Sequence, residues 1–114
     1  MSRLRAGELN KRIALQYLVK RRGSLGEPLP DQVVAVGKVW AKAEPISNRK
    51  IRLLDQPQVV ETYQFTLRPR TDVQQDWQIV LGDLVFTVRA MDRTQPDRLV
   101  ITAEACTRND RISH

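Results

Sequence analysis

The chain has 114 residues, 41% of them hydrophobic and 28% charged, which is the size and composition of a single globular domain spanning residues 1–114. Lys and Arg number 19 against 13 Asp and Glu, so the net charge is +6, which suits nucleic-acid or acidic-protein partners without establishing either. No apolar run approaches the roughly 20 residues of a membrane span, and the first residues lack the apolar region of a secretory signal. One cysteine, Cys106, allows no intramolecular disulfide and suits a reducing cytoplasm.

The first regular element follows a basic entry segment at residues 3–12. Apolar side chains then alternate with mostly polar ones, and the apolar positions are Ile13, Leu15, Tyr17 and Val19. A period of two residues predicts a half-buried strand.

Residues 20–32 show no periodicity and contain two glycines and two prolines. This composition predicts a long flexible loop. Loops of that length in a compact domain are commonly functional, so we expect an arm that is mobile in the free protein and orders against a partner.

Residues 33–45 read as one long bent strand. Val33 to Val36 is β-branched and apolar, and Gly37 within the pattern indicates a bulge or a barrel corner. Pro45 cannot donate to a ladder, so the strand should end there or lie at an edge.

Trp40 falls on the opposite face of this strand from Val39 and Ala41. A side chain of that size is seldom left in water. Its cover would be either the segment 47–56 folding back or an adjoining subunit, and we expect the segment because it follows directly in the chain.

Residues 47–56 differ from their surroundings. Ser47 can cap a helix, Ile51 and Leu54 are three residues apart, and Pro57 limits continuation. These signals predict a short helix, with a loop as the alternative.

From Glu61 onward the alternation is that of strands, with turns near 68–72 and 92–98 and a type II′ hairpin turn at Gly82-Asp83. The polar tail 107–114 is expected to fray. The fold class is therefore mainly β: a small antiparallel β-barrel of about six strands with one short inserted helix and a long flexible loop.

Residues that could perform catalysis do not form a recognisable set. The only histidine is His114, the last residue, and Cys106 sits in a strand pattern, where a buried structural thiol is the expected state. The aspartates fall in predicted turns, and neither a phosphate loop nor a metal-binding spacing is present in the sequence. We expect a non-enzyme with no cofactor and no metal; an enzyme would need a concave pocket holding an acid pair of raised pKa.

Basic residues gather in three places, and they could serve a nucleic-acid-binding barrel or a docking surface for an acidic protein. The alternative is simply solvated loop charge. The aromatic residues Tyr17, Tyr63, Phe65 and Phe86 lie on apolar strand faces and favour a core role over base stacking. The three basic groups are Lys20, Arg21 and Arg22; Arg49, Lys50 and Arg52; and Arg68 with Arg70.

Four segments in register resemble the head-tail joining proteins of tailed bacteriophages and prophages, the small adaptor or stopper subunits of the connector. They are the opening Arg5–Ile13, the Val-Trp-Ala-x-Ala-x-Pro segment at Val39–Ser47, the strand and turn Tyr63–Asp72, and the hairpin Trp77–Val88. The chain departs from that family in the loop after the first strand, where Gly23 and Gly26 are separated and valines stand in place of the family's loop tryptophan, and at Ala43, which replaces a bulkier aliphatic residue.

This resemblance implies a β-barrel whose subunits form a ring on the portal protein and bridge head to tail after DNA packaging. The implied partners are the portal protein, tail-completion proteins and other copies of the chain, with packaged DNA nearby and no membrane. The implied location is the virion, with the bacterial host cytoplasm before assembly. Lys20, Arg21, Arg22, Arg49, Lys50 and Arg52 are the candidate assembly residues.

Overall fold

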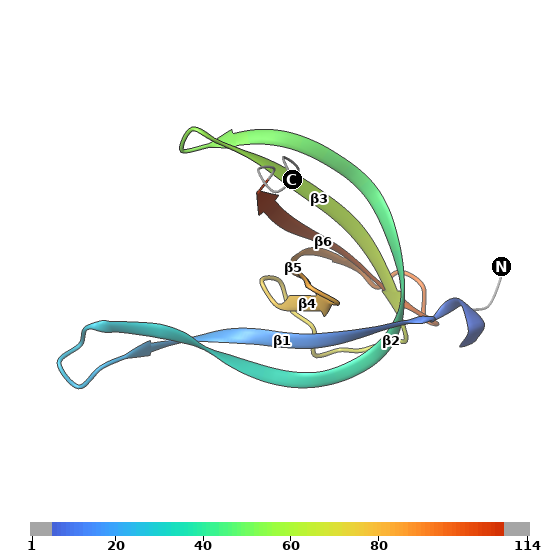
Figure 1. Cartoon of the computed structure of the whole chain (residues 1–114). Helices are drawn as coiled ribbons and strands as arrows, with labels where there is room; N and C mark the ends of the chain where they lie inside the picture. The colour runs from blue at the N-terminus through green and yellow to red at the C-terminus, as the bar shows by residue number, and fades with distance from the viewer. Residues whose placement is uncertain (1–5, 109–114) are drawn as a thin grey trace.

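The structure, a computed structural model, describes residues 6–108 and is almost entirely β (Figure 1). A single 3-10 turn at Ala6–Glu8 precedes the strands. The strands are β1 (Lys11–Arg22), β2 (Pro28–Leu53), β3 (Gln56–Leu67), β4 (Gln78–Leu81), β5 (Leu84–Asp92) and β6 (Leu99–Arg108). All pairings are antiparallel, and the order β1-β2-β3-β6-β5-β4 closes back onto β1, which confirms the predicted small barrel.

The long strand β2 gives the molecule its shape. It pairs with β1 as far as Ala41 and with β3 from Ala41 onward, so it serves two neighbours in succession. Bulges bend it near Gly37, as predicted, and again between Pro45 and Ser47. Pro45 does not end the strand, but it lies beyond the last residue that pairs with β1, at an edge.

The core fills the ring where all six strands run together. Phe65 and Phe86 are fully buried and meet edge to face, with ring centroids 5.2 Å apart. Tyr63 lies 4.9 Å from Phe86, so three of the four predicted core aromatics form one cluster. The other buried members of the core are Ile13, Leu15, Ala41, Leu67, Val73, Ile79, Val88, Leu99, Ile101, Ala103 and Ala105.

Two β-ribbons extend from the barrel (Figure 1). We call residues 18–33 the β1–β2 arm and residues 46–61 the β2–β3 arm. The Cα radius of gyration is 16.4 Å, whereas a compact chain of this length has about 13 Å. The arms account for that difference, because they carry paired backbone away from the core.

The predicted loop at residues 20–32 is wrong in extent. Only residues 23–27 turn, closed by a hydrogen bond from the Gly23 amide to the Glu27 carbonyl of 2.8 Å. Arg21 pairs with Leu29, and Arg22 pairs with Pro28. Pro28 and Pro30 at the start of β2 masked the strand signal, because an edge strand tolerates proline that a central strand does not.

The predicted helix at residues 47–56 is also wrong. These residues continue β2, turn at Leu54 and Asp55, and return along β3. Both turn residues have positive φ, 52° and 64°, the pattern of a type I′ turn. Leu-Asp is an uncommon pair there, so no turn signal was visible. Seven cross-strand pairs between residues 47–53 and β3 outweigh a weak helical spacing.

The second half of the chain follows the prediction more closely. Gly82 has a positive φ of 59°, whereas the φ of Asp83 is not positive. A type II′ turn requires this combination. Thr107 and Arg108, predicted to fray, lie in β6, and residues 109–114 fall outside the described part. Arg3 and Arg5 of the basic entry segment also lie outside it. Within residues 6–108, no helix is long and apolar enough to cross a membrane.

The pairing in the β1–β2 arm predicts its hydrogen exchange. Within residues 18–22 and 29–33, the amides that point across the ribbon should exchange more slowly than the amide of Ser24, because only they are bonded to the opposite strand. Native-state exchange read by NMR on the free protein measures this. Uniformly fast exchange through 18–33 would instead show a mobile arm.

The Leu54-Asp55 turn predicts a stabilising double change. Replacing Leu54→Asn with Asp55→Gly removes the penalty of a left-handed leucine, so opening of the β2–β3 arm should cost about 1 kcal/mol more and its amides exchange about fivefold more slowly. Leu54→Ala is the control, because it removes the exposed side chain and leaves the strained φ. Equal exchange in the double variant and the parent would contradict the strain.

Candidate assembly surfaces

The first predicted cluster lies on the β1–β2 arm. Lys20, Arg21 and Arg22 are all exposed, on the part of β1 that has β2 as its only neighbour. Arg22 also donates from Nη1 to the Gly26 carbonyl at 3.3 Å and so braces the turn. Leu25 at the tip is 92% exposed. The arm therefore presents both positive charge and apolar surface.

The second predicted cluster lies on the β2–β3 arm and is exposed, as expected. Strand alternation places Lys50 and Arg52 on one face of the ribbon and Arg49 on the other. Arg49 Nη2 is 3.7 Å from Glu104 Oε2, and Arg89 Nε donates to the other oxygen of Glu104 at 3.2 Å. Lys50 and Arg52 have no ion-pair partner among residues 6–108, so their charge is the uncompensated part of the cluster.

The structure does not bring these two clusters together. They lie on separate arms, whose tips diverge from the barrel (Figure 1). The candidate residues thus form two surfaces, and a partner that touches both must be large or be more than one molecule.

The predicted intrachain cover of Trp40 is wrong. The segment 47–56 runs outward in the β2–β3 arm, and Trp40 remains 50% exposed. The Arg12 guanidinium, on the strand residue paired with Trp40, lies 5.2 Å from the indole ring centroid. This cation–π contact covers part of the ring, and the rest borders a pocket.

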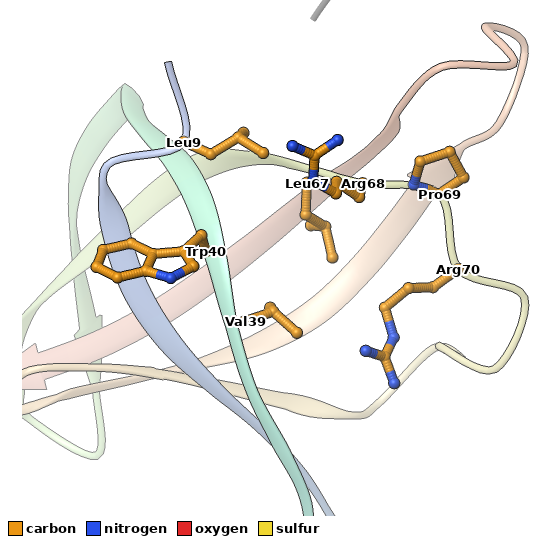
Figure 2. A pocket seen from close by; sticks show the side chains of 7 residues that line it. All are labelled: Leu9, Val39, Trp40, Leu67, Arg68, Pro69 and Arg70. Carbon is orange, nitrogen blue, oxygen red and sulfur yellow. The ribbon is translucent and has the colours of Figure 1, made fainter. Parts of the chain in front are cut away.

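That pocket has a volume of about 300 Å³ and is lined by residues just before β1, in the middle of β2 and at the end of β3 (Figure 2). Leu9 and Leu67, both almost fully buried, contribute to its wall. The indole of Trp40 stands on one side and the guanidinium of Arg70 on the other (Figure 2). The lining residues are Leu9, Val39, Trp40, Leu67, Arg68, Pro69 and Arg70.

Sequence reasoning missed this pocket because its residues come from three separate segments. The one available signal was Trp40 on the outer face of its strand. Arg68 and Arg70 were noted only as loop charge. Their position beside Trp40 depends on β2 pairing with both β1 and β3 at Ala41.

Two carboxylates, Asp72 and Asp92, have lowered pKa values because they accept hydrogen bonds. Arg70 donates two hydrogen bonds to Asp72, at 3.0 and 2.8 Å, and this holds the pKa of the Asp72 carboxyl below its usual value. Hydrogen bonds from the Thr94 hydroxyl and amide likewise lower the pKa of Asp92. Both shifts run opposite to the raised pKa that a general acid needs.

Two further expectations concern cysteine and metals. Cys106 was predicted to be buried and is exposed, because strand alternation places it on the opposite face of β6 from the buried Ala105; its thiol lies against the Gln58 side chain. Among the described residues, no group of three His, Cys, Asp or Glu side chains could hold a metal ion.

The fold and the family are both recognisable. No curated protein matches the chain. A solved chain described as "Virion of native gene transfer agent (GTA) particle" is similar with a TM-score of 0.70 and 16% identity, over 84% of this chain and 93% of that chain. It therefore shares the fold. A family model described as phage head completion protein matches residues 4–105. This agrees with the resemblance found in the sequence, and the chain belongs to the phage head completion protein family.

Proposed function

We propose that this phage head-closure protein is a connector subunit that docks on the portal protein as a ring and joins head to tail after DNA packaging. The two projecting β-ribbons carry the proposal. A subunit of a ring must contact neighbours beyond its own core, through surfaces that are unsatisfied in the monomer. Both arms offer such surfaces, with exposed leucines at their tips and one-sided strand pairing.

The partners under this proposal are the portal protein, tail-completion proteins and other copies of the chain. The protein would wait in the host cytoplasm and end in the virion. It would act by binding alone, not as an enzyme. The lowered carboxyl pKa values of Asp72 and Asp92 support that view, because they keep both groups ionised and bonded.

A nucleic-acid-binding barrel is the second candidate, supported by the net charge of +6 and the half-exposed Trp40. It requires a contiguous face of aromatic and basic side chains, whereas Phe65 and Phe86 are buried. A salt titration against single-stranded DNA separates the two. A nucleic-acid binder loses affinity steeply as salt rises, because phosphate contacts release counterions.

Charge reversal on the β2–β3 arm tests the leading proposal. Lys50→Glu with Arg52→Glu should leave the fold intact, since exposed changes alter stability by about 0.5 kcal/mol or less each. Tail attachment should nevertheless fall, because like charges would face an acidic partner. The measurement is the fraction of tailed particles, counted by electron microscopy after complementation with the variant.

The matched control reverses two charges on the barrel, Lys11→Glu with Lys38→Glu. Both lysines are exposed, and both lie on the paired part of β1 and β2. This control should support normal tail attachment. If the arm variant attaches tails as well as the control does, the β2–β3 arm is not the contact.

A further inference from the structure

We propose that the pocket beside Trp40 binds a short acidic segment of another protein of the particle, with one bulky apolar side chain of that segment seated in the pocket. The site is separate from both arms, and the identity of the partner as a particle protein rests on the proposed function. The chemistry of the occupant rests on the pocket alone.

The shape and lining of the pocket call for an apolar anchor. Leu9 is 6% exposed and Leu67 is 1% exposed, so aliphatic side chains form a firm wall. A volume of about 300 Å³ is at the small end of binding pockets and suits one large side chain with its backbone. Trp40 is the type of residue that dominates binding energy when a partner covers it.

The charge around the pocket calls for an acidic flank. Arg12 lies over the indole, and Arg68 and Arg70 belong to the lining. Of these three arginines, Arg70 alone forms an ion pair within residues 6–108, and its partner is Asp72. Arg68 is exposed and has no ion-pair partner among the described residues. A carboxylate beside the anchor could pair with Arg68 through a charge-assisted hydrogen bond.

Other occupants fit less well. A second copy would bring the tip leucine Leu25, near Arg22 and Glu27, or Leu54, near Arg52 and Asp55. Both arms carry a net positive charge, which favours the arginines of the pocket less than an acidic segment does. The chain's own residues 1–5 contain two arginines and carry the same sign. A nucleobase could stack on the indole and accept a hydrogen bond from Arg68, but the aliphatic wall of the pocket suits an apolar side chain better than the polar edge of a base.

The test uses Trp40 as its own reporter. The chain has two tryptophans, so the full-length Trp77→Phe variant leaves Trp40 as the sole indole. The probes are acetylated, amidated peptides Asp-Glu-X-Glu-Asp in which X is Leu, Ile, Met or Phe. At least one should change the Trp40 emission saturably, with a dissociation constant below about 1 mM. Fluorescein-labelled peptides and the unmutated chain, read by polarisation, give an independent measurement.

Two substitutions with the same charge change locate the site. Arg68→Glu should weaken the best peptide by about tenfold or more, because a paired charge becomes a repelling one. Lys20→Glu, exposed on the β1–β2 arm, should change the affinity by less than about twofold, since only screened long-range charge is altered. Peptides with Ser at X should bind at least about tenfold more weakly, because the apolar anchor is lost.

Several results would overturn the proposal. These are no saturation by any peptide of the panel, equal binding of the Ser peptides, or equal effects of Arg68→Glu and Lys20→Glu. Tighter binding of the oligonucleotide dT10 at the same residues would assign the site to nucleic acid. Loss of self-association in Trp40→Ala, measured by sedimentation, would assign it to a second copy. A shift of Trp40 emission in Leu4→Ser without peptide would assign it to the chain's own N-terminal segment.

The peptide assay needs only the isolated protein, whereas tail attachment tests the connector role. A pocket that binds acidic peptides, in a protein whose deletion leaves tail attachment normal, would leave the site standing and remove the proposed function. The reverse pattern would remove the site alone.

Discussion

The architecture depends on one strand with two successive partners. The 26 residues of β2 pair first with β1 and then with β3, and Ala41 is the residue that pairs with both. Ala41 is fully buried, so the change of partner occurs inside the core. Bulges on either side of it let the strand curve around that point. Each half, once free of the other partner, continues outward as an arm.

The barrel is closed by far fewer backbone pairs than β2 makes with β1 and β3. Only Ala14–Gln16 of β1 pair with β4. The stacking of Tyr17 on Trp77, with ring centroids 5.2 Å apart, continues the contact by side chains where the ladder stops. The barrel is thus a small core from which two ribbons project and beside which the Trp40 pocket forms.

Sequence patterns predicted the elements that bury one face. Ile13 and Leu15 flank the partly exposed Ala14, and the structure buries both as the alternation implies. Phe65 and Leu67 are buried as well, although Thr66 between them is also buried. The arms were missed because their outer parts have only two strands and bury neither face, so they show no hydrophobic period. The pocket was missed for a different reason. It depends on which strands pair, and cross-strand register is not encoded in any one local segment.

Long, one-sided strands also carry a hazard, since an open strand edge can pair with any other chain that presents one. Three of the six prolines lie in β2, at Pro28, Pro30 and Pro45, each on a stretch with only one neighbouring strand. Each proline removes a backbone N–H donor from the strand edge. Lys38, Lys42 and Lys50, elsewhere in the same strand, add charge repulsion between copies. Proline on these stretches therefore hinders edge-to-edge strand pairing, the step that leads to fibres. The extended, partly apolar ribbons are thus less able to pair edge to edge with other copies of the chain.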